Sequence, residues 1–282
     1  MGLRRPRRAG LAWAVCWRPQ VLGAGLGLLG CLVSHHGYTQ PSTSPSGELL
    51  VFAAASLTES FTELGQRLES LHPGVHVLYN FGSSAALRTQ LEQGARADVF
   101  VSADLEQMER ARRQGVVQGE AAVVAHNRLV VIVPRHNPRH VQRWQDLATP
   151  GLKLVLAAAS VPVGQYSRQA LRLAQGEYGA DFMTQVLRNL ASEEDNVKQV
   201  VAKVRLGEAD AGMVYRSDVT AKVQPDVLTL PIPDAYNPLA AYPLALTADV
   251  RNRPAAEAWV ALLLSPAGQA ILKAHGFIPV RD

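Results

Sequence analysis

The chain has 282 residues, 48% of them hydrophobic, and a formal net charge of +4. Five arginines and no acidic residue stand in the first 30 positions, so the rest of the chain carries a net charge of −1. This near-neutral remainder excludes the broad basic surface of a nucleic-acid-binding protein, and its length allows two α/β lobes with hydrophobic cores.

The N-terminus has the features of an export signal. Its arginines are followed by an apolar run over residues 21–29, shorter than the roughly 20 apolar residues of a membrane-spanning helix. The run ends in Leu28-Leu29-Gly30-Cys31, which resembles the lipobox of bacterial lipoproteins, where the cysteine becomes the lipidated first residue. We predict a lipoprotein-type signal peptide over residues 1–30 and lipidation of Cys31. Ordinary cleavage a few residues later and an uncleaved anchor remain alternatives.

Residues 31–47 are expected to form a flexible tether, because they are rich in His, Ser, Thr, Pro and Gly. The chain has two cysteines, Cys16 and Cys31, and no cysteine follows residue 47. Neither a disulfide nor a cysteine metal site is therefore expected in the folded part of the chain. The resulting picture is a soluble module outside the cytoplasm, periplasmic or at the cell surface, held to the membrane by an N-terminal lipid.

From Glu48 onward, short apolar strands alternate with amphipathic helices. Strands are expected at residues 49–53, 75–81, 98–103, 129–134, 152–157, 211–215, 227–230 and 242–246. Helices are expected at residues 56–70, 85–93, 104–114, 164–173, 181–190, 196–206, 254–264 and 266–275. This alternation predicts an α/β fold with mostly parallel sheets, helices on both faces, and ligands near the carboxyl ends of the strands.

Two segments end a strand in small hydroxyl residues and then begin a helix. One runs over residues 51–59 and contains Ser56, and the other runs over residues 79–87 and contains Ser84. A helix N-terminus presents unpartnered N–H groups and partial positive charge, so two of them can surround an oxyanion without any Lys or Arg. The pattern favours capture of a small anion over catalysis.

Each of these segments also has a purely structural interpretation. Ser56-Leu57-Thr58-Glu59 fits a capping box, and Gly82-Ser83-Ser84 is common in ordinary turns. Further strand or helix boundaries with possible donors occur at residues 161–166, 194–197 and 212–218, the last of which contains Tyr215.

Five motifs, in order, resemble the bacterial molybdate-binding proteins of ABC transporters. They lie at residues 51–57, 81–84, 97–104, 161–164 and 207–215, and the resemblance extends over residues 49–279. It implies a two-lobed periplasmic-binding-protein type II fold whose hinge consists of two crossing segments. Lobe 1 would comprise residues 48–131 and 240–282, and lobe 2 residues 132–239.

The resemblance also implies five ligand-binding positions, which are Ser56, Ser84, Val163, Val197 and Tyr215. Val163 departs from the Pro-Ala-Gly of the family, which matters little if only its main-chain N–H is used. Val197 follows an acidic pair in a segment that is one residue longer than in some members. Whether Glu194 or Asp195 enters the ligand shell stays open.

The implied ligand is molybdate, and also tungstate, because both are doubly charged and their oxygens only accept hydrogen bonds. The family further implies a monomer that is not an enzyme, needs no cofactor, binds no metal ion directly, and delivers its ligand to a membrane permease with an ATPase subunit. Sulfate has the same charge, so discrimination against it would depend on the size of the cavity.

Two rival functions remain. The same fold could bind another oxyanion, such as sulfate, or a carboxylate. Alternatively, the chain could be an exported esterase or phosphatase with Ser56 or Ser84 as nucleophile, which would need a base such as His72, His76 or His126. The sequence has no HExxH, GxSxG or P-loop motif to support a zinc enzyme, a hydrolase elbow or ATP hydrolysis.

Overall fold

The computed structural model describes residues 44–280. The expected signal peptide, the lipidation site Cys31 and most of the expected tether lie outside the described residues. Gly47, expected to end the tether, is instead the first residue of strand β1, and its N–H donates to the carbonyl of Gly74 at 2.6 Å.

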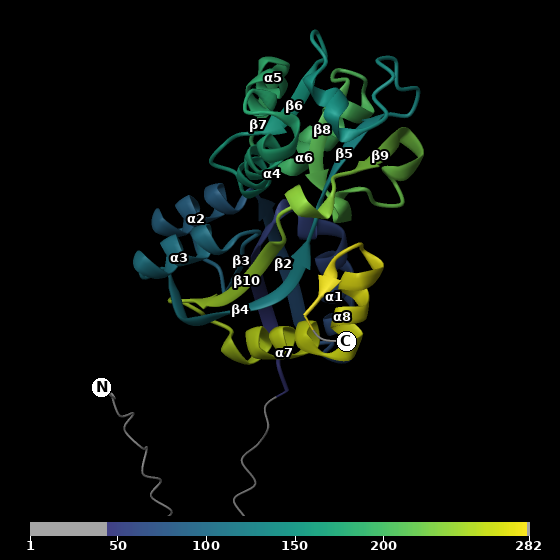
Figure 1. The fold of residues 1–282 in the computed structure, drawn as a ribbon. Coiled ribbons are helices and arrows are strands. Elements are labelled where there is room, and N and C mark those ends of the chain that lie inside the picture. Colours follow the sequence, from purple (N-terminus) through teal and green to yellow (C-terminus); the bar gives the residue numbers. More distant parts are fainter. Residues whose placement is uncertain (1–43, 281–282) are drawn as a thin grey trace, which may run out of the picture. The chain divides into compact units, whose positions relative to one another are not determined.

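The first sheet has six strands in the order β11-β4-β10-β3-β1-β2 (Figure 1). Its strands are β1 (Gly47–Ala54), β2 (Val75–Gly82), β3 (Val99–Val101), β4 (Val117–Asn127), β10 (Ala240–Thr247) and β11 (Ile278–Pro279). The second sheet has five strands in the order β7-β6-β8-β5-β9. Its strands are β5 (Leu129–Pro134), β6 (Leu154–Ala157), β7 (Leu190–Glu194), β8 (Ala211–Tyr215) and β9 (Val227–Pro231).

Helices connect most of the strands. The α-helices are α1 (Thr58–Leu71), α2 (Ser84–Glu92), α3 (Leu105–Arg113), α4 (Pro162–Tyr178), α5 (Phe182–Arg188), α6 (Val197–Arg205), α7 (Arg253–Leu264) and α8 (Pro266–Ala274). Short 3₁₀ helices are η1 (Ala55–Leu57), η2 (Trp144–Ala148), η3 (Arg216–Asp218), η4 (Gln224–Asp226) and η5 (Asp234–Tyr236). Within residues 44–280 no single helix has the length and hydropathy of a membrane span. Helices α7 and α8 have that length and hydropathy only when taken together, and a bend of 66° separates them.

The two-lobed α/β architecture is confirmed, but the sheets are mixed rather than mostly parallel. Parallel pairing joins β1 to β2 and β3, and β6 to β7 and β8. The strands next to the passages between the sheets, β4, β5 and β10, pair antiparallel with their neighbours. Two parallel neighbouring strands need a crossover connection that returns the chain to the end of the sheet where the first strand began. A chain that passes to the other sheet makes no such crossover connection.

The chain passes between the sheets twice. Asn127 ends β4 and Leu129 begins β5, so only Arg128 separates the two sheets at the first crossing. The return lies between η5 and β10. Leu129 already pairs with Tyr215, so all of β5 belongs to the second sheet, and the limit expected between residues 131 and 132 falls inside this strand.

Alternation along β1 explains how helices cover both faces of the first sheet. Leu49, Val51 and Ala53 enter one hydrophobic cluster, and Phe52 enters another. On the first face, Phe61 of α1 meets Trp259 of α7 edge to face, with ring centroids 4.9 Å apart. The second face is covered by α2 and α3, which contribute Leu87 and Met108. Helices thus cover both faces of the first sheet, and the ends of its strands supply part of the wall of the cavity described next.

Candidate functional site

All five residues expected to bind the ligand line one small cavity. The centre of a water-sized sphere can move through about 20 Å³ of it, so it suits a ligand of few heavy atoms. Its walls come from segments that follow the carboxyl ends of strands in both sheets. The lining residues are Ala54, Ala55, Ser56, Gly82, Ser83, Ser84, Ala103, Val161, Pro162, Val163, Asn196, Val197 and Tyr215.

Helix N-termini surround this cavity. Ser83 caps α2, Val161 precedes α4, and Asn196 caps α6. The caps bind only part of each first turn: Ser83 Oγ accepts from the Ala86 amide at 3.3 Å, and Asn196 Oδ1 accepts from the Gln199 amide at 3.2 Å. The first N–H groups of the three helices have no intrahelical acceptor, so together they make the cavity electropositive without a formal charge.

Ser56 does not form the capping box that its sequence allows. It lies in η1, and α1 begins one turn later with Leu57 at its N-cap, where no side-chain cap occurs within the described chain. Its hydroxyl instead lies 3.0 Å from that of Tyr242, and Ser56 is only 3% exposed. The extra 3₁₀ turn thus frees Ser56 from the helix backbone.

Ser84 is the first residue of α2, and the capping role belongs to its neighbour Ser83. Ser84 Oγ accepts a hydrogen bond from the Ala103 amide at 2.9 Å, and the residue is 1% exposed. A serine hydroxyl can accept and donate at once. Since Ser84 Oγ only accepts in its bond with Ala103, its proton remains available to a ligand in the cavity.

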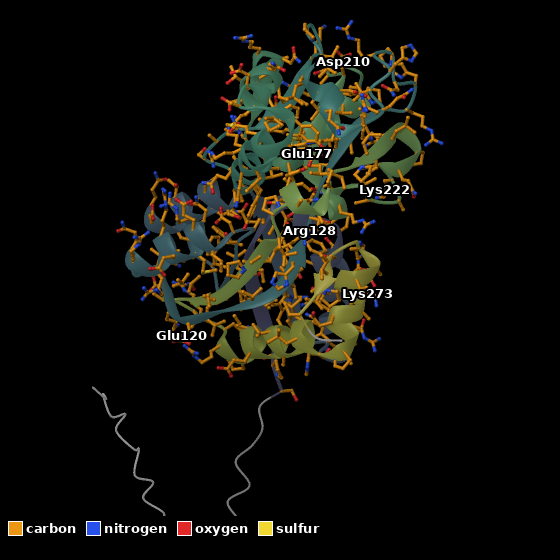
Figure 2. All side chains as sticks on the ribbon, viewed as in Figure 1. Glu120, Arg128, Glu177, Asp210, Lys222 and Lys273 are labelled. Atoms are coloured by element: carbon orange, nitrogen blue, oxygen red, sulfur yellow. The ribbon has the colours of Figure 1, made fainter. Side chains whose placement is uncertain are left out.

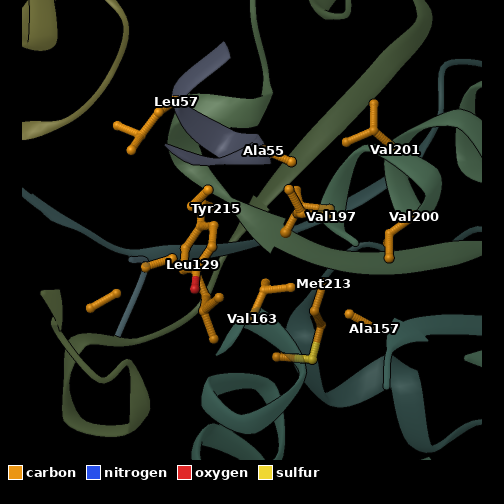
Figure 3. Close-up of a cluster of buried hydrophobic side chains, with 14 of the residues drawn as sticks. Ala55, Leu57, Leu129, Ala157, Val163, Val197, Val200, Val201, Met213 and Tyr215 are labelled. Carbon is orange, nitrogen blue, oxygen red and sulfur yellow. The ribbon is translucent and has the colours of Figure 1, made fainter. Parts of the chain in front are cut away.

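Val163 and Val197 reach the cavity through the first turns of α4 and α6. Pro162, at the first position of α4, has no N–H, so Val163 supplies the first amide N–H of that helix. Both valine side chains are buried in the hydrophobic core, where Figure 3 shows them in the same cluster as Met213 and Tyr215. The core thus accommodates the larger side chain that Val163 introduces.

Tyr215 ends β8 and holds its hydroxyl in the interior. The residue is 1% exposed, and the hydroxyl has no hydrogen-bond partner among residues 44–280. Tyr166 and Tyr242 pack against its ring edge to face, with centroids 6.4 and 5.8 Å away. Burial raises the pKa of Tyr215 well above its usual value, so the group stays protonated and can donate. An unpartnered buried hydroxyl is costly, and a bound acceptor would remove that cost.

Among the described residues, those that line the cavity are all uncharged. Charged side chains such as Glu120, Asp210 and Lys222 lie toward the outside of the ribbon (Figure 2). Glu194 is held by Ser192 at 2.7 Å and by Lys203 at 2.6 Å, and Asp195 is exposed, so neither acid joins the cavity wall.

The groups that a hydrolase or a metal site would need are not assembled here. In the described part of the chain the cavity wall contains neither a histidine nor a carboxylate, so His72, His76 and His126 are not part of it. No cluster of three or more His, Cys, Asp or Glu side chains suited to a metal ion occurs within residues 44–280.

An ion pair that the sequence did not reveal joins the two sides of the cavity. Lys198, next to Val197 in α6, lies 2.8 Å from Glu59 in α1 and 3.5 Å from Asp218 in η3. Burial raises the pKa of Asp218 to about 6, and the Lys198 ammonium partly opposes this shift. Spacing along the chain gave no signal for this pair, because Glu59 and Lys198 lie 139 positions apart.

The described fold and cavity can be compared with known proteins. Residues 49–278 match the family of bacterial extracellular solute-binding proteins. The molybdate-binding protein ModA of Mycobacterium tuberculosis is 35% identical over 257 residues, which cover 89% of this chain and 92% of that protein. The molybdate-binding protein ModA of Escherichia coli is 31% identical over 239 residues, covering 82% of this chain and 89% of that protein.

Among solved structures, the sulfate-binding protein SubI of Mycobacterium tuberculosis superposes with a TM-score of 0.77. The superposition covers 83% of this chain and 88% of SubI. Because the sequence identity is 18%, this likeness shows the fold alone. The family match covers most of the chain and agrees with the two-lobed architecture. The chain belongs to the family of bacterial extracellular solute-binding proteins.

Proposed function

We propose that this protein captures molybdate, and also tungstate, outside the cytoplasm for import by an ABC transporter. The observation that carries this proposal is an uncharged cavity in which helix N-termini and hydroxyl groups converge, one of them the unpartnered hydroxyl of Tyr215. Two relatives with 31–35% identity over most of the chain are named molybdate-binding proteins, which supports this ligand.

The proposed ligand set consists of three hydroxyl groups and two backbone amides. Ser56, Ser84 and Tyr215 donate through their hydroxyls, and Val163 and Val197 donate through their N–H groups. Hydrogen bonds to a charged acceptor contribute about 1.5–3 kcal/mol each, so five of them hold a dianion without a buried Lys or Arg. An oxyanion without a proton suits this set, because every group in it donates.

Delivery to a membrane permease and its ATPase subunit completes the proposed role. The two lobes, joined at Arg128 and between η5 and β10, close over the ion and exclude water. A lipid on Cys31 holds the protein at the membrane, and the protein is a monomer. It binds its ligand without catalysing a reaction, and it uses neither a cofactor nor a direct metal-ion ligand.

Isothermal titration calorimetry of the purified protein tests the ligand. We expect saturable binding of molybdate and tungstate, with sulfate binding more weakly in competition. Heat with sulfate or phosphate and none with molybdate would overturn the ligand assignment. Hydrolysis of p-nitrophenyl esters or phosphates that Ser84→Ala abolishes would contradict the binding role itself.

A further inference from the structure

Behind Ser56 lies a chain of buried polar side chains to which the proposed function assigns no role. The hydroxyl of Tyr242 on β10 is 3.0 Å from Ser56 Oγ and 3.4 Å from Asn127 Nδ2. Asn127 Nδ2 also lies 2.8 Å from Ser217 Oγ. Tyr242 and Asn127 are fully buried, so within the described residues these groups satisfy one another rather than solvent.

The backbone determines which end of the Asn127 amide is the donor. The N–H of Arg128 lies 2.9 Å from Asn127 Oδ1, and a backbone N–H only donates, so the atom that it meets is the amide oxygen. The other end of the amide is therefore the NH₂ group. It donates to Ser217 and to Tyr242, and the Tyr242 oxygen accepts.

This orientation decides the direction of the bond between Tyr242 and Ser56. The Tyr242 hydroxyl has one proton, and Ser56 Oγ is the acceptor within its reach among the described residues. If Ser56 donated instead, the Tyr242 proton would be buried without a partner, at a cost comparable to a lost hydrogen bond. Tyr242 therefore donates, Ser56 accepts, and the Ser56 proton points away from Tyr242.

We infer that Tyr242 and Asn127 are positioning residues that orient the Ser56 hydroxyl as a hydrogen-bond donor into the cavity, and that they favour oxyanions without a proton. This inference rests on the proposed function. Ser84 is oriented in the same sense by the Ala103 amide, so both serines accept from the protein and donate to the ligand. A monohydrogen oxyanion such as HPO₄²⁻ would bring a proton that meets the serine protons directed at the ligand rather than an oriented acceptor.

A double-mutant cycle tests the inference by calorimetry with molybdate. The variants are Ser56→Ala, Tyr242→Phe and the combination of the two. Phenylalanine keeps the ring that packs against Tyr215 and Phe277, with centroids 5.8 and 5.2 Å away. Tyr242→Phe should weaken binding about five- to tenfold in the wild-type background, the worth of one oriented hydrogen bond. In the Ser56→Ala background it should change affinity by less than about twofold, because its effect passes through Ser56.

Tyr166→Phe is the matched control. Tyr166 also packs on Tyr215, at 6.4 Å between centroids, but its hydroxyl has no contact with Ser56 among the hydrogen bonds of residues 44–280. Its effect should add to that of Ser56→Ala. As a second measurement, the ratio of molybdate to phosphate affinity should fall in Tyr242→Phe, because the Ser56 hydroxyl is then free to rotate and accept from a protonated ligand.

The possible outcomes separate the inference from the proposed function. If the wild-type protein binds molybdate but Tyr242→Phe and Ser56→Ala are additive, the positioning role is wrong and the proposed function stands. An unchanged affinity in Tyr242→Phe leads to the same conclusion. If the wild-type protein binds sulfate alone, the ligand assignment fails, and the same cycle with sulfate decides on the positioning role. If it binds no oxyanion, both are overturned.

Discussion

At the scale of single residues, the site depends on where hydroxyl protons point. Ser84 uses its oxygen to accept from the Ala103 amide, whereas Tyr215 has no partner within residues 44–280. These two hydroxyls therefore contribute differently to the stability of the ligand-free protein, even though both are proposed to donate to the same ion.

Tyr215→Phe should weaken molybdate binding by about 1–3 kcal/mol and leave the free energy of unfolding of the ligand-free protein unchanged or higher. The hydroxyl that is removed makes no bond that the unliganded fold would lose. Ser84→Ala is the contrasting variant, because it leaves the buried Ala103 amide without its acceptor and should lower both affinity and stability. Calorimetry and denaturant unfolding of the two variants measure this contrast, and a marked loss of stability in Tyr215→Phe would contradict it.

A buried carboxyl near the site predicts a dependence of stability on pH. Asp104 caps α3, with Oδ1 accepting from the Gln107 amide at 2.7 Å, and Oδ2 has no partner in the described part of the chain. Burial raises the pKa of Asp104 from 3.8 to about 6. The folded protein therefore binds the proton more tightly than the unfolded chain, and the stabilisation from protonation, present below pH 4, is lost as the pH rises through about 6.

Asp104→Asn should remove the Asp104 contribution to the pH dependence, leave that of Asp218, and keep a good N-cap. We expect the variant to be more stable than the wild type at pH 7.5, with the difference shrinking toward pH 4. Thermal unfolding between these values measures it. Asp104→Ala is the control that loses the cap as well as the charge. A constant difference between Asp104→Asn and wild type across this range would show that the carboxyl titrates normally.

At the scale of elements, the cavity depends on how closely helices begin beside strand ends. Gly164, in the first turn of α4, lies against the end of β6, where a Cβ would overlap the carbonyl oxygens of Ala157 and Ala158. Only glycine lets this turn approach so closely, and the turn contains the amide of Val163.

Gly164→Ala should lower the free energy of unfolding by about 1–3 kcal/mol, because the new methyl group overlaps backbone atoms. It should also weaken molybdate binding, since α4 must shift together with the Val163 amide. Gly176→Ala in the same helix is the matched control, because a Cβ there has nothing within 4 Å. It should leave binding unchanged and stabilise the helix by about 0.5–1 kcal/mol. Equal effects of the two substitutions would argue against a close approach at Gly164.

The elements that sequence patterns missed are those that depend on distant partners. Strand β4 contains Gly119 and Glu120 and an exposed stretch, so it shows no clear alternation, and it forms because β10 and β11 pair with it. Strand β7 ends in Glu193 and Glu194, which are poor strand formers. Arg168 and Lys203 pair with these two acids after folding.

At the scale of the whole described unit, the binding site depends on two lobes meeting. The ion pair between Glu59 and Lys198 joins an α-helix of the first sheet to one of the second. Both side chains are partly exposed, at 36% and 29%, so the pair is worth only about 0.2–1 kcal/mol and is screened by salt. Because the pair links the two lobes beside Val197, we expect it to favour closure of the cavity.

Glu59→Gln should therefore weaken molybdate binding about two- to fivefold at low ionic strength, and this effect should vanish near 1 M salt. Asp226→Asn is the matched control, because Asp226 pairs with Arg205 at 2.8 Å on the second sheet's side alone. That variant should bind as the wild type does at every salt concentration. If both variants behave alike, the Glu59 pair has no special link to the closure of the lobes.

The sequence by itself determined the α/β class, most helices and strands, and the segments that form the cavity. These features depend on local pattern: apolar periodicity, helix starts, and small residues at strand ends. The five proposed ligand residues were placed by the resemblance to molybdate-binding proteins, and each lies in such a segment. Only the tertiary structure decided the strand order of the two sheets and their mixture of parallel and antiparallel pairs. It also decided that Ser83 is the cap of α2 and that the Tyr215 hydroxyl has no partner within the described residues. The same holds for the contacts of Ser56 with Tyr242 and of Glu59 with Lys198. These contacts join residues more than 100 positions apart, and such pairings are set by the packing of the whole chain rather than by any local pattern.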